Sequence, residues 1–211
     1  MSSRLQEIYD TLYTAFGPQH WWPGETPFEV LIGAVLTQNT AWTNVERAIA
    51  NLKAADALSL DGLAALDTVI LAELIRPSGY YNQKAARLQG LIRYITDTHG
   101  DLDAFFDQDT ESLREELLSL KGIGPETADS IALYAAGKPT FVVDAYTHRI
   151  FSRHNLIAEE AGYHEIREMF MDGLPEDVPL YNEYHALIVR LGKEYCKKSK
   201  PRCEQCPLQG I

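Results

Sequence analysis

Apolar residues recur every three or four positions along most of this chain. In the first segment Leu5, Ile8 and Leu12 follow this spacing, which places all three on one face of a helix. Sustained alternation of apolar and polar residues is missing, and the β-prone run Phe141–Val143 is too short to indicate a sheet. We therefore expect an all-α protein of about ten helices. The same period predicts further helices in residues 28–36, 45–52, 71–75, 85–95, 113–118 and 131–135.

The composition is that of an ordinary globular protein, with 211 residues of which 45% are hydrophobic and 23% are charged. No apolar run reaches the roughly 18 to 20 residues that span a bilayer, so no membrane partner is expected. The N-terminal segment lacks a basic stretch followed by an apolar one, which argues against a signal peptide. We expect a cytoplasmic protein.

The net charge of -11, considered alone, argues against a nucleic-acid partner, because phosphate binding requires clustered cations. The charges are unevenly distributed, however. Acidic residues gather in residues 101–116, where we interpret them as solvated surface, and basic residues gather in residues 193–202. A compact protein with this distribution can keep one cationic face for DNA.

The most informative segment is residues 120–128, Leu-Lys-Gly-Ile-Gly-Pro-Glu-Thr-Ala, which lies between two helical patterns. Gly122 and Gly124 permit positive φ, so the chain can reverse sharply, and they leave backbone N–H groups uncovered. Pro125 suits the first position of the next helix, and Ile123 fits between the two helices. Exposed N–H groups in this setting attract a phosphate oxygen. A plain helix–helix turn is the alternative, but the length of the string favours a phosphate-binding hairpin.

Asp144 follows an apolar run and precedes a helical pattern, so it can cap that helix. A carboxylate held at a helix start has a fixed direction and tends to stay ionised. Cleavage of an N-glycosidic bond builds positive charge on the sugar. An anion aimed at that charge stabilises the transition state and can orient the attacking water. Capping and catalysis are compatible roles for this residue.

The glycine hairpin followed downstream by Val143-Asp144 resembles the signature of the endonuclease III superfamily of helix-hairpin-helix (HhH-GPD) DNA glycosylases. Residues 28–40 and the turn 79–85 are similar to further motifs of that family, so the resemblance covers most of the chain. It implies that Asp144 is the catalytic aspartate. It also implies that Gln38, with residues around Tyr80, fills the gap that a flipped damaged base leaves in double-stranded DNA. The residues expected to bind DNA are Gln38, Tyr80, Gly122, Ile123, Gly124 and Thr127.

Glu126 departs from one part of that family. Bifunctional members carry a lysine at this motif position, in the second helix of the hairpin, and the lysine attacks the sugar to form a Schiff base. A carboxylate cannot form the imine, so strand cleavage loses its nucleophile. The resemblance therefore implies a monofunctional glycosylase that uses water.

Aromatic residues indicate which base is removed. The string Trp21-Trp22-Pro23 and the single Trp42 either anchor the N-terminal segment or build a slot that stacks a flipped base. With residues 33–40, 76–79 and 121–124, this string resembles the branch called 3-methyladenine DNA glycosylase III, which usually has Phe at position 42. Ring-alkylated purines carry positive charge, which stacks well on indole faces. The resemblance implies a base pocket formed by Trp21, Trp22, Pro23, Trp42 and Glu126.

Cys196, Cys203 and Cys206 have the spacing C-x6-C-x2-C. An odd number of cysteines in one short tail does not indicate a disulfide framework. The spacing resembles the iron–sulfur loop of the family, which implies a [4Fe-4S] cluster whose fourth ligand would fall one residue past Ile211. Zinc is the alternative metal, since three thiolates and a fourth ligand also satisfy it. The branch includes members without a cluster.

We expect two helical domains, residues 25–137 with the hairpin and residues 1–24 plus 138–211 with the cysteine loop. DNA would bind in a cleft between them, with Asp144 and Glu126 facing each other, and the protein would act as a monomer. The predicted function is hydrolysis of the N-glycosidic bond of alkylated purines such as 3-methyladenine in base excision repair. Two alternatives stay open: an endonuclease III-like glycosylase and AP lyase for oxidised pyrimidines, and a non-catalytic binder of damaged DNA.

Overall fold

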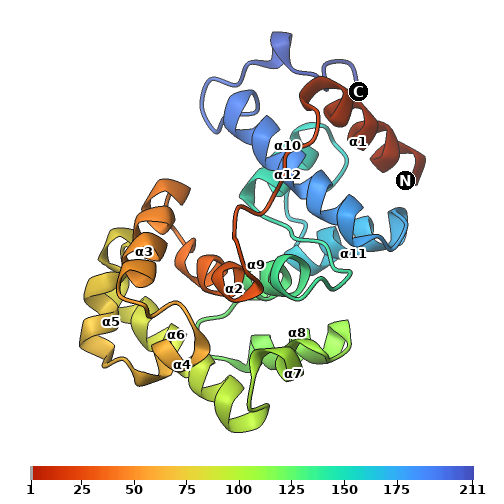
Figure 1. Cartoon of the computed structure of the whole chain (residues 1–211). Coiled ribbons are helices and arrows are strands. Elements are labelled where there is room, and N and C mark those ends of the chain that lie inside the picture. The colour runs from red at the N-terminus through yellow and green to blue at the C-terminus, as the bar shows by residue number, and fades with distance from the viewer. Residues whose placement is uncertain (1) are drawn as a thin grey trace. The chain divides into compact units, whose positions relative to one another are not determined.

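The computed structural model describes residues 2–211 and is built from helices (Figure 1). No β-strand occurs among these residues, so the predicted all-α architecture is confirmed. The chain divides into two compact units. The central unit comprises Pro23–Lys138, and the terminal unit combines Met1–Trp22 with Pro139–Ile211.

The elements of each unit follow in chain order. The central unit contains α2 (Pro27–Leu36), α3 (Trp42–Ala54), α4 (Leu60–Ala65), α5 (Thr68–Leu74), the 3-10 turn η1 (Arg76–Ser78), α6 (Tyr81–Thr98), α7 (Leu102–Phe106), α8 (Thr110–Ser119), α9 (Pro125–Ser130) and the π-helical turn η2 (Ile131–Ala135). The terminal unit contains α1 (Ser2–Phe16), α10 (Ala145–Arg153), α11 (Tyr163–Gly173), α12 (Val178–Glu194) and the 3-10 turn η3 (Cys203–Gln205).

Helix α2 forms the core of the central unit. Thr26 caps it by accepting a hydrogen bond from the N–H of Glu29, and Pro27 occupies its first turn. Leu31 and Val35 are fully buried, because α2 packs against α3, α6, α9 and η2. A helix that is apolar on every side requires such enclosure. The end of α2, from which Gln38 projects, is therefore held firmly by its neighbours.

The terminal unit joins the first helix to the last two. In this unit α1 packs against α11 and α12, and the Tyr184 hydroxyl of α12 donates a hydrogen bond of 2.9 Å to the Leu5 carbonyl oxygen of α1. Phe141 stacks on Phe170 of α11 with ring centroids 3.8 Å apart. The run Phe141–Val143 is buried and extended, but it forms no strand. Its burial fixes the chain directly before Asp144.

The helices predicted from periodicity are confirmed, with boundaries that differ by a few residues. The short helices α4 and α7 and the C-terminal helices α11 and α12 are further elements that the periodicity did not single out. The acidic residues of segment 101–116 are mostly exposed, as expected, but two of them also have a structural role. Asp101 caps α7 and Asp109 caps α8 through their carboxylates. Within residues 2–211, no helix is long and apolar enough to cross a membrane.

Candidate active site

Asp144 is the N-cap residue of α10 in the terminal unit. Its Oδ1 accepts hydrogen bonds from the N–H of Tyr146 at 2.9 Å, from the N–H of Thr147 at 2.8 Å and from the Thr147 hydroxyl at 3.0 Å. Thr147 Oγ1 in turn accepts a bond from the Asp144 N–H at 3.4 Å, which completes a capping box. One carboxylate oxygen is thereby fixed by the helix start, and the direction of the other, Oδ2, follows from it.

His185 of α12 lies beside this carboxylate, with its Nε2 3.6 Å from Asp144 Oδ2. Burial of Asp144 disfavours its charged form, but the neighbouring His185 imidazole and the bonds from Thr147 act in the opposite direction. Their combined effect lowers the pKa of Asp144 below its ordinary value. The site therefore holds an ionised carboxylate at neutral pH. Sequence reasoning missed His185, because a single histidine on an apolar helix face is typical of a core residue.

The hairpin of the central unit connects α8 to α9. Gly122 adopts a φ of +90°, a conformation that a residue with a side chain rarely adopts. Gly124 has a φ of -95° and acts as the N-cap of α9, so only the first of the two glycines needs positive φ. Ile123 is 6% exposed, and Pro125 stands in the first turn of α9, as expected.

A buried ion pair fixes the two helices of the hairpin. Arg114 of α8 donates from Nε to Asp129 Oδ1 of α9 at 2.8 Å, and its Nη2 lies 3.4 Å from Asp129 Oδ2. The side chains of the pair are 9% and 0% exposed. Between these helices, the N–H groups of Gly122 and Gly124 reach no backbone acceptor among residues 2–211. Both groups are available to an external acceptor on an exposed turn.

Gln38 is attached to this hairpin by its side chain. Its Nε2 donates to the Gly122 carbonyl oxygen at 3.1 Å and to Thr127 Oγ1 at 2.9 Å. Its Oε1 accepts a bond of 2.6 Å from Arg87 Nη1 of α6. The structure thus brings together three of the residues expected to bind DNA. It adds Arg87, which the sequence did not single out.

Tyr80 lies at the start of α6 with a left-handed backbone, and its side chain is 65% exposed. Four residues later Lys84 is 1% exposed, and its Nζ donates to the carbonyl oxygens of Leu36 at 2.8 Å and Ser78 at 2.7 Å. Burial lowers the pKa of Lys84 to about 8. This ammonium joins the end of α2 to the turn that carries Tyr80.

The three tryptophans fall in different units. In the terminal unit Trp21 and Trp22 are half-buried with ring centroids 5.5 Å apart, and Lys193 Nζ lies 5.8 Å from the Trp21 ring centroid. In the central unit Trp42 begins α3, and its Nε1 donates to Glu46 Oε1 at 3.0 Å. Pro23 and Glu126 of the same unit are exposed. Each of these side chains is accessible within its own unit.

The three cysteines line one cavity of about 270 Å³ in the terminal unit. Arg153 of α10 organises the loop around it, because its Nη1 donates to the Lys197 carbonyl oxygen at 2.7 Å and lies 3.4 Å from Cys196 Sγ. Within residues 2–211, no three His, Cys, Asp or Glu side chains are close enough to hold a single metal ion. The loop therefore places the three thiols around one cavity.

Comparison with known proteins matches this chain to DNA repair proteins. The sequence model of HhH-GPD superfamily base excision DNA repair proteins matches residues 32–176. A candidate DNA repair glycosylase of Methanocaldococcus jannaschii is 51% identical over 207 residues, which cover 97% of this chain and 94% of that protein. Endonuclease III of Thermotoga maritima is 34% identical over 183 residues, which cover 87% of this chain and 81% of that protein.

A solved structure is similar in fold as well as in sequence. The crystal structure of the H. pylori 3-methyladenine DNA glycosylase bound to 1,N6-ethenoadenine matches with a TM-score of 0.79 and 36% identity. The match covers 90% of this chain and 97% of that one. It therefore includes both the central and the terminal unit.

Proposed function

Because this chain belongs to the HhH-GPD superfamily and is a DNA glycosylase of base excision repair, we propose that its substrates are alkylated purines such as 3-methyladenine. It hydrolyses their N-glycosidic bond and leaves the DNA strand intact. The observation that carries this proposal is Glu126, at the hairpin position where a strand-cleaving relative needs a lysine. The similarity to the H. pylori 3-methyladenine enzyme supports the choice of base.

Asp144 supplies the charge for this reaction. The helix start engages Oδ1, so we assign Oδ2 to the sugar and the water. As the bond to the base breaks, positive charge grows on the sugar, and the carboxylate stabilises it. The same oxygen orients the water that attacks the sugar. An alkylated purine is already cationic and leaves readily, so a strong general acid is not needed.

The tryptophans would recognise the flipped base. An indole face attracts a cationic ring, and stacking of a base on an aromatic side chain contributes about 1–3 kcal/mol. Trp21 already has the Lys193 ammonium over its ring, which supports its capacity to bind a cation. The proposed pocket consists of Trp21, Trp22, Pro23, Trp42 and Glu126. The bond to Glu46 orients the Trp42 indole along α3.

The hairpin would hold the DNA backbone, while Gln38 and Tyr80 fill the gap behind the flipped nucleotide. The uncovered N–H groups of Gly122 and Gly124 fit a phosphate oxygen, which supports this assignment. Ile123 anchors the hairpin in the core. Thr127 is buried and would contribute by holding Gln38, whose Nε2 donates to its hydroxyl oxygen.

We assign the cysteine loop to a [4Fe-4S] cluster rather than to zinc, because the C-x6-C-x2-C spacing resembles the iron–sulfur loop of the family. Cys196, Cys203 and Cys206 line one cavity, so these three thiolates would hold the cluster. When bound, the cluster cross-links the loop and holds its lysines in place.

The similarity to Endonuclease III of Thermotoga maritima supports a second candidate, a glycosylase and AP lyase for oxidised pyrimidines. Glu126 argues against it, and the ionised Asp144 argues against a binder without activity. The test incubates the protein with methylated duplex DNA and with a thymine glycol duplex, then analyses free bases and strand nicks separately. We expect 3-methyladenine in solution, no nicking, and no covalent complex after borohydride reduction. Release of thymine glycol with nicking, and no methylated base, would replace this proposal by the second candidate.

A further inference from the structure

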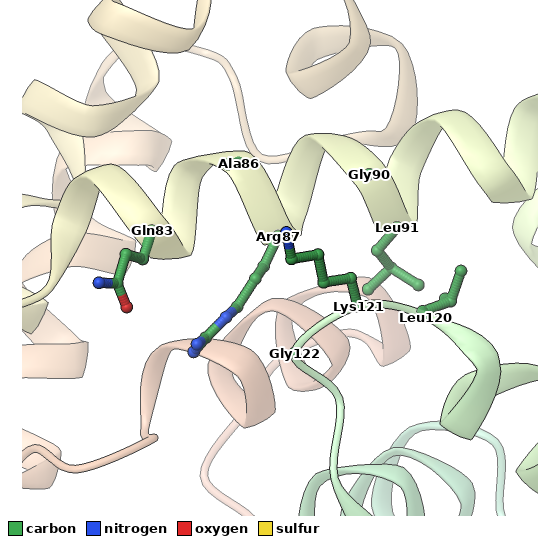
Figure 2. A pocket seen from close by; sticks show the side chains of 8 residues that line it. All are labelled: Gln83, Ala86, Arg87, Gly90, Leu91, Leu120, Lys121 and Gly122. Carbon is green, nitrogen blue, oxygen red and sulfur yellow. The ribbon is translucent and has the colours of Figure 1, made fainter.

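A cavity of about 510 Å³ lies beside the hairpin in the central unit. One wall is the face of α6 that carries Gln83 and Arg87, and the opposite wall is the hairpin segment Leu120–Gly122 (Figure 2). In Figure 2 the Gln83 and Arg87 side chains project from α6 on the hairpin side, and the Lys121 side chain extends along the helix. The polar side chains that line the cavity are thus the two cations Arg87 and Lys121 and the amide of Gln83.

Among the described residues 2–211, no carboxylate lines this cavity. Neither Arg87 nor Lys121 forms an ion pair among residues 2–211, although the chain has 30 acidic and 19 basic residues. Elsewhere in the same unit, Lys53 contacts Glu25 and Glu29. Two cations without a carboxylate in an acidic protein leave the cavity with a local positive potential.

The guanidinium of Arg87 is held in place before any ligand arrives. Its Nη1 donates to Gln38 Oε1 at 2.6 Å, and an amide oxygen fixes the group without neutralising its charge. A Cβ atom at Gly122 would lie 2.3 Å from Arg87 Nε, so the glycine also gives the arginine its space. A fixed planar donor with its charge retained suits the oxygens of a phosphate group.

We propose that this cavity binds a backbone phosphodiester of DNA through Arg87 and Lys121. The site differs from the backbone N–H groups of Gly122 and Gly124, because it uses the side chains of Arg87 and Lys121 and is shared with α6. It would engage a second phosphate of the strand that the hairpin holds. Through Gln38, the same arginine would link this phosphate to the residue that fills the gap in the duplex. The inference rests on the proposed function, since it assumes that the hairpin holds DNA.

The test measures binding to an undamaged duplex by fluorescence anisotropy at several KCl concentrations. The slope of log K against log salt is negative, and each phosphate contact that is lost reduces its magnitude by about 0.9. We expect this decrease in Lys121→Gln, with binding about five- to tenfold weaker at low salt. Lys121→Arg retains the cation and should keep the wild-type slope. Arg87→Gln should reduce the magnitude of the slope as Lys121→Gln does.

Arg93→Gln is the matched control, because Arg93 is an exposed arginine on α6 that lines a different cavity together with Asp67. It should bind DNA like the wild type. A wild-type slope in both Lys121→Gln and Arg87→Gln overturns the proposal. If inorganic phosphate competes with DNA more strongly than chloride at equal ionic strength, and only when Lys121 is present, DNA and phosphate share the cavity, which supports the proposal.

The outcomes separate this inference from the proposed function. A wild-type protein that binds duplex DNA and releases 3-methyladenine, with variants that keep its salt slope, contradicts only the cavity site. A wild-type protein that releases no base from methylated DNA contradicts the proposed function, whatever the salt slopes show.

Discussion

Replacement of Asp144 by asparagine separates the charge of this residue from its role as a helix cap. The amide oxygen of asparagine can accept the same three hydrogen bonds that Asp144 Oδ1 receives from Tyr146 and Thr147. Asn and Asp are nearly equivalent at an N-cap, so the free energy of unfolding should fall by less than about 1 kcal/mol. The negative charge that faces His185 is lost entirely.

The loss of that charge should have a large effect on the reaction. The pKa of Asp144 is lowered, so the wild-type carboxylate is ionised at neutral pH, and it retains its charge to lower pH than an ordinary aspartate. Removal of one preorganised electrostatic group costs roughly 100- to 1,000-fold in rate, or about 3–4 kcal/mol. We expect a decrease of this size in the single-turnover rate of 3-methyladenine release. DNA binding should remain close to that of the wild type.

Asp177→Asn provides the control, because Asp177 caps α12 of the same unit by accepting a bond of 2.7 Å from the Leu180 N–H. Both variants are tested for urea unfolding, duplex binding and release of methylated bases with enzyme in excess. Only Asp144→Asn should lose excision. If it released bases at nearly the wild-type rate, or if both variants lost excision equally, the catalytic role of Asp144 would be refuted.

Further predictions concern stability, the base pocket and the loop. Asp129→Ala leaves the Arg114 guanidinium buried without its carboxylate and should lower the free energy of unfolding by about 3–5 kcal/mol in a urea titration. The folded-state pKa of Lys84 is about 8, below its ordinary value of 10.5, so the unfolded chain binds more protons between these pH values and stability rises with pH. Wild-type protein should therefore gain about 2 kcal/mol relative to Lys84→Met between about pH 7.5 and about pH 9.5, and parallel curves would contradict this. Trp42→Ala should weaken 3-methyladenine release by the equivalent of about 1–3 kcal/mol, while thymine glycol remains a non-substrate. Cys203→Ser should abolish the broad absorbance that we expect from the purified wild-type protein at about 400 nm, and it should weaken DNA binding more than the chemical step. Stoichiometric zinc in the wild-type protein would contradict the cluster.

Local signals made parts of the fold and site predictable. Asp144 directly precedes a helical pattern, and Gly122 and Pro125 mark the turn and the helix start within a few residues of each other. Such features depend on neighbours in sequence, so the chain alone reveals them. The same holds for α2, where the spacing of the apolar residues and the apolar composition both predict a buried helix.

Contacts between segments that lie far apart in the sequence could not be predicted from the sequence. Gln38 reaches Gly122 and Thr127 across 84 and 89 positions, and Arg87 reaches Gln38 across 49. Nothing near any of these residues specifies the partner, because packing of α2, α6 and the hairpin brings them together. His185 is a similar case, since its place beside Asp144 depends on how α12 packs on α10. The single-residue roles were therefore predictable, but their connections were not.

The terminal unit combines segments from before and after the central unit, and this has a consequence for how the protein is made. Helix α1 is translated before the central unit, but its buried residues Leu5, Ile8 and Leu12 pack in a unit whose other helices are translated after it. At about 5–20 residues per second, α1 waits on the order of 10 to 40 s for α11 and α12. During this interval its apolar face is open to chaperones and proteases, while all residues of Pro23–Lys138 have already been synthesised. The unit that holds Asp144 can thus assemble only after the central unit has been synthesised, so a nascent chain cannot act on DNA before α12 leaves the ribosome.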